Sequence, residues 1–102
     1  MLVILGDTAF TLFAQTKNSS NTPTNADSHA VTYAIYAPGG SSSLLSGSFT
    51  ASIVDSKTGW YKTASLSITS GNGFAAGSVY RVRIAYAISS TNYVDDQTFT
   101  VT

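Results

Sequence analysis

The residues best suited to acid–base chemistry lie together in one polar stretch of the chain. His29 is the only histidine, and it directly follows Asp27 and Ser28. Serine, histidine and aspartate can supply a nucleophile and its base, but nothing resembling a nucleophile elbow accompanies them. The chain has no cysteine and only five acidic residues, so groups for general acid–base or thiolate catalysis are scarce. We expect no catalytic residue, and we interpret His29 as a hydrated loop residue.

Charged side chains that could hold a metal ion or an acidic partner are also few. Asp95 and Asp96 form the only acidic pair, and successive side chains of a strand point to opposite faces. They therefore cannot chelate one ion together, and calcium takes about six to eight oxygen ligands. We expect no metal and no cofactor. Arg81 and Arg83 share one strand face, where they either meet an acidic partner or, as we favour, pair with an aspartate across a neighbouring strand.

Composition limits the class of protein further. The 102 residues suffice for a single domain, residues 1–102, with a core that needs no disulfides. A formal net charge of zero, with 10% charged residues, lacks the basic footprint of a nucleic-acid-binding protein. No apolar run approaches the about 18 residues of a membrane helix. Strong helix formers are scarce, whereas Thr, Val, Tyr and Phe are abundant, so we expect an all-β protein.

Apolar and polar residues alternate between turn signals along most of the chain. The residues predicted to point inward are Phe10, Leu12 and Ala14 in strand 8–15; Val31, Tyr33 and Ile35; Phe49, Ala51 and Ile53 in strand 49–55; Trp60, Ala64, Leu66 and Ile68 in strand 60–68; Tyr80, Val82, Ile84 and Tyr86 in strand 80–86; and Phe99 and Val101. Leu44 and Leu45 mark a short connecting strand. Seven or eight short strands separated by turns are typical of an antiparallel sandwich.

Two segments resemble a known family. Gly77 precedes Tyr80, which opens an alternating strand, and this spacing resembles the tyrosine corner of immunoglobulin-like sandwiches. The segment from Tyr33 to Gly40, YAIYAPGG, resembles a strand and turn of small immunoglobulin-like domains in tailed-bacteriophage virion proteins. The resemblance implies a single antiparallel immunoglobulin-like β-sandwich of seven to eight strands, with Tyr80 and Gly77 forming a structural corner. The missing cysteines and the late position of Trp60 exclude an antibody-type domain.

An apolar run at the start of the chain is the segment that we most expect to contact a partner. It consists of Leu2, Val3, Ile4 and Leu5. An uncharged run of this kind is an aggregation hazard when exposed, so it either pairs within the sandwich or adds a strand to a partner. Residues 1–6 are thus a possible docking strand. The polar stretch 17–29 has no periodicity, and we expect loop contacts from its asparagines Asn18, Asn21 and Asn25.

The resemblance implies a non-enzymatic virion structural protein. It would be a capsid decoration or a head or tail surface component that binds other virion proteins and associates with itself, without binding nucleic acid or membrane. No basic residue precedes the apolar run, so we expect no secretion signal and a protein made in the host cytoplasm and exposed on the virion surface. The alternative is a carbohydrate- or cell-surface-binding module. Tyr36, Tyr61 and Tyr93 fall off the predicted buried faces and could stack on a host-surface glycan.

Overall fold

The chain folds into two layers of β-strands. The computed structural model describes residues 1–50 and 54–102. Its strands are β1 (Leu2–Val3), β2 (Asp7–Phe10), β3 (Phe13–Gln15), β4 (Val31–Tyr36), β5 (Ser43–Ser48), β6 (Trp60–Lys62), β7 (Leu66–Ile68), β8 (Val79–Ile88) and β9 (Thr91–Val101). Short 3₁₀ turns lie at Asp27–His29, Val54–Ser56 and Ser70–Asn72. No α-helix occurs in the described residues, so the all-β prediction is confirmed.

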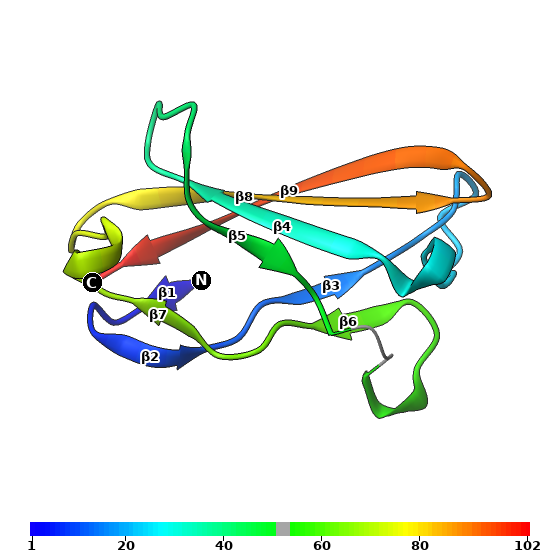
Figure 1. The fold of residues 1–102 in the computed structure, drawn as a ribbon, viewed down its shortest axis with the longest axis horizontal. Coiled ribbons are helices and arrows are strands. Elements are labelled where there is room, and N and C mark those ends of the chain that lie inside the picture. The colour runs from blue at the N-terminus through cyan, green and yellow to red at the C-terminus, as the bar shows by residue number, and fades with distance from the viewer. Residues whose placement is uncertain (51–53) are drawn as a thin grey trace.

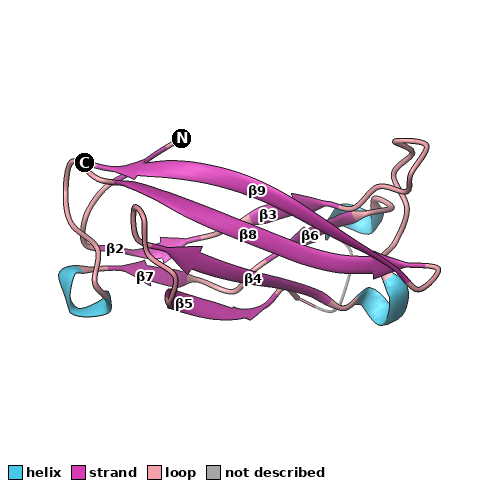
Figure 2. Cartoon of the chain, turned by 90° about the horizontal axis from the view of Figure 1, so that it is seen from above, coloured by secondary structure: helices cyan, strands magenta, loops and turns pink. Residues whose placement is uncertain are grey.

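The first layer is a five-stranded sheet with the order β1-β9-β8-β4-β5. The second layer consists of two strand pairs, β2 with β7 and β3 with β6, which lie below the large sheet in Figure 1 and behind it in Figure 2. The order β9-β8-β4-β5 corresponds to the G-F-C-C′ order of an immunoglobulin-type sandwich. The alternation of β-branched and aromatic residues with polar ones in β4 and β8 explains why each strand buries one face.

One strand pair departs from the predicted antiparallel arrangement. β1 runs parallel to β9, with Leu2 opposite Thr100 and Val3 opposite Val101. All other strand pairs in the described ranges are antiparallel. A hairpin forces two strands to run in opposite directions, but β1 and β9 are distant in the sequence and no hairpin joins them. Their relative direction is therefore set by packing.

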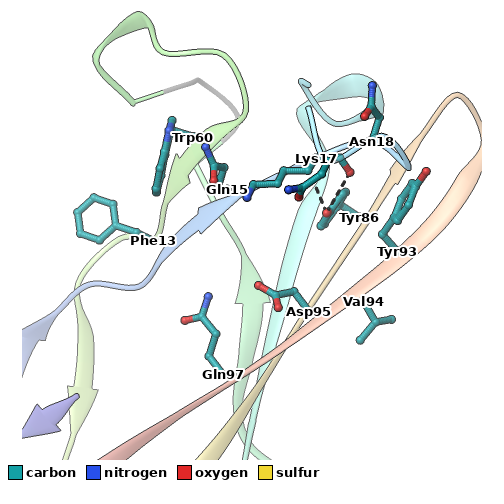
Figure 3. Close-up of a pocket in the computed structure, with 11 residues that line it drawn as sticks. Phe13, Gln15, Lys17, Asn18, Trp60, Tyr86, Tyr93, Val94, Asp95 and Gln97 are labelled. Carbon is teal, nitrogen blue, oxygen red and sulfur yellow. Dashed lines mark hydrogen bonds between the residues drawn. The ribbon is translucent and has the colours of Figure 1, made fainter. Parts of the chain in front are cut away.

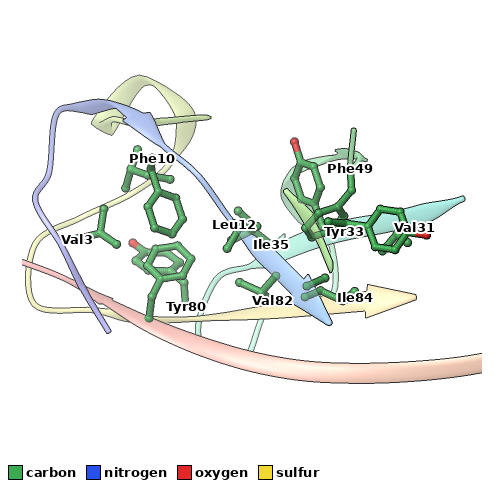
Figure 4. Close-up of a cluster of buried hydrophobic side chains, with 14 of the residues drawn as sticks. Val3, Phe10, Leu12, Val31, Tyr33, Ile35, Phe49, Tyr80, Val82 and Ile84 are labelled. Carbon is green, nitrogen blue, oxygen red and sulfur yellow. The ribbon is translucent and has the colours of Figure 1, made fainter. Parts of the chain in front are cut away.

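The core lies between the two layers (Figure 4). Phe10, Leu12 and Ala14 are buried as predicted, although the expected strand is interrupted between β2 and β3. Thr63 bridges this interruption, because its Oγ1 accepts a hydrogen bond from the Leu12 N–H at 3.0 Å and its own N–H donates to the Leu12 carbonyl oxygen at 3.0 Å. The buried hydroxyl thus replaces part of the missing strand ladder.

The predicted inward face of strand 60–68 is wrong in its first half. Tyr61 is wholly buried, whereas Trp60 is only half-buried and Ala64 is exposed. The strand is broken between β6 and β7, and this break changes the alternation by one residue before Ile68, which is buried as predicted. A shift of one residue reverses every side chain of a strand.

Part of another predicted strand cannot be compared. Phe49 is buried as predicted, but the described ends of strand 49–55 are not a strand. Phe49 follows the end of β5, and Val54–Ser56 form a 3₁₀ turn. Residues 51–53 of that strand lie outside the described residues. The short strand predicted around Leu44 and Leu45 is confirmed as part of β5, which pairs with β4.

Candidate functional site

The apolar run at the start of the chain pairs with its own sandwich. The N–H of Thr100 donates to the Met1 carbonyl oxygen at 2.9 Å, and the N–H of Thr102 donates to the Val3 carbonyl oxygen at 2.8 Å. The Leu5 N–H then donates to the Thr102 carbonyl oxygen at 3.0 Å. The sequence left open whether this run pairs within the sandwich or adds a strand to a partner. These hydrogen bonds show that it pairs within the sandwich.

Only half of this run is buried by the pairing. Val3 is buried in the core and Leu5 packs partly against it, whereas Leu2 is 74% exposed and Ile4 is 72% exposed. Val79 of β8, itself 50% exposed, lies opposite Thr100, which also pairs with Leu2. Residues opposite one another in register share a sheet face. Leu2 and Val79 therefore lie on the outer face of the large sheet, on either side of Thr100. These two residues and the exposed Ile4, two positions after Leu2, are called here the terminal patch.

The three loop asparagines have different surroundings. The Oδ1 of Asn18 accepts the N–H groups of Ser20 and Thr22, each at 3.0 Å, and so shapes the loop itself. The Oδ1 of Asn25 accepts the N–H of Gly59 at 2.7 Å and ties the loop to the chain before β6. Asn21 is exposed and adopts a left-handed backbone conformation with φ of 60°. Asn18 and Asn25 therefore have structural hydrogen bonds, and Asn21 presents its side chain to solvent.

The residues that could have formed a catalytic set bind different partners. Nδ1 of His29 lies 2.7 Å from the hydroxyl oxygen of Tyr61, which is itself buried. The carboxylate of Asp27 instead accepts the N–H groups of Ser89 at 3.0 Å and Ser90 at 2.9 Å, at the turn between β8 and β9. Within residues 1–50 and 54–102, no three His, Cys, Asp or Glu side chains gather to hold a metal ion.

The arginines of β8 contact residues of their own sheet. Nε of Arg83 donates to Oδ1 of Asp96 at 3.2 Å, across the register of β8 and β9, as the favoured interpretation predicted. This hydrogen bond and charge raise the pKa of Arg83. The guanidinium of Arg81 lies 4.9 Å above the ring centroid of Tyr36, which is the geometry of a cation–π contact. Both cations thus have intramolecular partners on the outer face of the large sheet.

The three tyrosines proposed as a glycan surface do not form one. Tyr61 is wholly buried, so its predicted exposure is wrong. Tyr36 lies on the outer face of the large sheet beneath Arg81. Tyr93 lies on the opposite face, where its ring stacks on that of Tyr86 with centroids 5.5 Å apart.

The structure instead contains an open groove that sequence reasoning missed. It has a volume of about 470 Å³ and lies between β9 of the large sheet and β3 and β6 of the second layer (Figure 3). Its lining comprises Phe13, Gln15, Lys17, Asn18, Asn21, Trp60, Tyr86, Tyr93, Val94, Asp95 and Gln97. Two of the predicted contact residues, Asn18 and Asn21, border it. The sequence contains one signal for the groove, because the inner positions of β9 change from Phe99 and Val101 to Gln97 and Asp95.

Comparisons with known proteins add no assignment to these surfaces. No family model, curated protein or solved structure matches the chain. In the described part of the chain, no helix has the length and apolar character needed to cross a membrane.

Proposed function

We propose that this protein is a non-enzymatic structural component of a virus particle, attached to a capsid or tail surface by protein–protein contacts. The terminal patch is the observation that carries the proposal. Leu2 and Ile4 are each more than 70% exposed, although both belong to an ordered segment that is hydrogen-bonded to β9. The resemblance of the strand and turn from Tyr33 to Gly40 to phage virion domains supports the choice of particle.

The chemistry of the terminal patch favours a protein partner. Burying an aliphatic side chain contributes about 1.5–3 kcal/mol, and the patch holds three that are at least half exposed. β1 is also the outermost strand of the large sheet, so a partner strand can add beside it. The zero net charge of the chain adds little long-range repulsion against a neighbouring subunit.

The proposed test removes the patch without removing the strand. Deletion of residues 1–6 would also remove buried Val3, so we favour the surface variant Leu2→Ser, Ile4→Ser, Val79→Ser. Virus particles are produced from a genome in which the gene for this protein has been deleted. Purified wild-type protein or the variant is added to these particles, and the mixture is sedimented. We expect the wild type to sediment with the particles and the patch variant to remain in the supernatant.

The matched control is Val94→Ser, which replaces an exposed β-branched residue of β9 outside the terminal patch. It should sediment as the wild type does. Equal incorporation of the patch variant would show that the terminal patch is not the docking surface. Absence of the wild type from particles would overturn the virion proposal itself.

A further inference from the structure

The open groove between β9 and β3 is built from residues that the docking proposal does not use. It lies along the half of β9 that precedes Phe99, whereas β1 contacts β9 only at Thr100 and Val101 (Figures 1 and 3). The terminal patch and the groove are therefore separate surfaces. A ligand of the groove can be tested independently of particle attachment.

The groove exists because the inner face of β9 changes character along its length. Phe99 and Val101 are buried against the second layer, whereas Gln97 is half-buried and Asp95 is exposed on the same face. A carboxylate at a core-facing position is unfavourable unless it keeps water or finds a hydrogen-bonding partner. Asp95 and Gln97 thus indicate that this end of the sandwich faces water and polar groups.

Aromatic rings border the same groove from both layers. Phe13 of β3 is 49% exposed, and Trp60 and Tyr93 are half-buried at its walls (Figure 3). The ring of Tyr93 is held by stacking on Tyr86 at an interplanar angle of 17°. The Tyr86 hydroxyl in turn accepts a hydrogen bond from the Lys17 N–H at 3.2 Å. An aromatic ring that is already fixed by its neighbours offers apolar surface to a ligand, and it loses little side-chain conformational entropy when the ligand binds.

The charges and hydrogen-bonding groups of the groove specify the kind of ligand. Lys17 and Asp95 are its only formally charged lining residues among the described part of the chain, so their charges cancel. A polyanion finds no net attraction there. The side-chain amides of Gln15 and Gln97 each offer donors and an acceptor, and the carboxylate of Asp95 accepts. Aromatic faces combined with donors and acceptors, and without net charge, match a neutral polyhydroxylated ring.

We propose that this groove binds a neutral oligosaccharide. The apolar C–H faces of its sugar rings pack on Phe13, Trp60 and Tyr93. Its hydroxyl groups donate to the carboxylate of Asp95 and exchange hydrogen bonds with the amides of Gln15 and Gln97. A peptide that adds a strand to β9 beside the groove, along the part that β1 does not pair with, is the competing occupant, and the experiment separates the two.

Trp60 provides the measurement, because it is the only tryptophan of the chain and lies at the groove. The full chain is titrated with a panel of neutral hexasaccharides built from glucose, mannose, xylose, galactose or N-acetylglucosamine, and tryptophan emission is recorded. We expect a saturable change in emission with at least one member of the panel. An acidic oligosaccharide, hexagalacturonate, should bind more weakly than the neutral sugar that binds best.

The decisive variants are adjacent aspartates on opposite faces of β9. Asp95→Ala removes a groove acceptor and should weaken binding about tenfold or more, since hydrogen bonds to charged groups are among the stronger ones. Asp96→Ala removes the neighbouring carboxylate, which pairs with Arg83 outside the groove, and should bind as the wild type does. Phe13→Ala should also weaken binding while leaving the core intact, because its side chain is exposed.

Three outcomes would overturn the proposal. One is the absence of a saturable emission change with every neutral sugar of the panel. Another is equal binding by Asp95→Ala and Asp96→Ala, which would place the sugar outside the groove. The third is binding of another class of ligand. Tighter binding of hexagalacturonate than of every neutral sugar would assign the groove to a charged ligand, and a saturable emission change with an extended peptide but with no sugar would assign it to strand addition.

Discussion

The hydroxyl oxygen of Tyr80 accepts a hydrogen bond from the backbone N–H of Ala75 at 2.7 Å. This bond spans the corner by which the chain reaches β8, and the ring of Tyr80 packs against Phe74 and Phe99 with centroids 4.8 and 5.7 Å away. The N–H of Gly77, in a left-handed conformation with φ of 89°, donates to the Val101 carbonyl oxygen at 2.7 Å within the same corner. One buried tyrosine thus connects the corner to the core.

Removing that hydroxyl should destabilise the fold without changing its core. Tyr80→Phe keeps the ring but leaves the Ala75 N–H without its acceptor, which should lower the free energy of unfolding by about 1 kcal/mol in urea denaturation. Tyr93→Phe removes a hydroxyl beside the open groove and should have a smaller effect. Equal losses in the two variants would contradict a specific role for the corner bond.

Gly59 should be the glycine least tolerant of substitution. Its φ is +80°, and a Cβ there would lie 2.7 Å from the Thr16 carbonyl oxygen and 3.2 Å from the Thr24 nitrogen, both backbone atoms. Strain and overlap together should cost Gly59→Ala about 3 kcal/mol or more of unfolding free energy. Gly39→Ala is the matched control, because Gly39 also has a positive φ but no atom within 4 Å of the added Cβ.

The control isolates the backbone strain from the steric overlap. Gly39→Ala should lose about 1 kcal/mol from its left-handed conformation alone. Thermal and urea unfolding of both variants give the comparison. If the two variants lose the same stability, the close approach of Thr16 and Thr24 to Gly59 is not what restricts that position.

Asp27 should stabilise a turn that is distant in the sequence. Its two carboxylate oxygens accept the N–H groups of Ser89 and Ser90, which both have positive φ, as in the type I′ turns of tight hairpins. Asp27→Ala should cost about 1–2 kcal/mol and increase amide hydrogen exchange at both serines. Asp96→Ala removes an exposed ion pair and should change stability little. Unaltered exchange at Ser89 and Ser90 in Asp27→Ala would refute the link.

Alkaline pH should destabilise the fold through its buried tyrosines. Burial raises the pKa of Tyr33 and of Tyr61 above the usual 10.0, although the hydrogen bond from the Ala26 N–H acts in the opposite direction on Tyr61. Well below pH 10.0 both the folded and the unfolded state keep these protons, and the two groups contribute no pH dependence. Above it the unfolded chain loses its protons first, so the free energy of unfolding falls as pH rises toward the raised folded-state pKa.

Urea unfolding at a series of pH values measures this loss. The wild type should show a steeper decline above pH 10.0 than Tyr33→Phe, which lacks one of the two ionisable groups. The compared quantity is the slope of the free energy of unfolding against pH, because Tyr33→Phe also changes the absolute stability. Identical slopes would exclude Tyr33 as a source of the pH dependence.

The alternation of apolar and polar residues along a strand explains which parts of the fold could be predicted from the sequence. Tyr80, Val82 and Ile84 occupy successive inward positions of β8, and the structure buries all three. The pattern of period two depends only on the pleat of a strand, so it can be found in the sequence without knowledge of the neighbours. Where a strand is interrupted, as between β6 and β7, the same pattern assigned Trp60 and Tyr61 to the wrong faces.

The candidate sites depended far more on contacts between distant segments. The sequence identified the apolar run but left its pairing open, and the structure places Val3 inside and Leu2 outside by pairing β1 with β9. Of the three tyrosines that the sequence suggested for sugar binding, Tyr93 lines the groove, beside Phe13 and Trp60 from two other strands. Neither arrangement follows from neighbouring residues.

The sequence by itself determined an all-β sandwich, the inward faces of β4 and β8, and a composition without net charge. Tertiary structure alone decided the parallel direction of β1, the burial of Tyr61 and the opening of a groove beside Asp95. The reason is the range of the interactions. Strand alternation follows from backbone geometry within a few residues, whereas register, strand direction and the uncovered half of β9 follow from packing between segments that lie far apart in the chain.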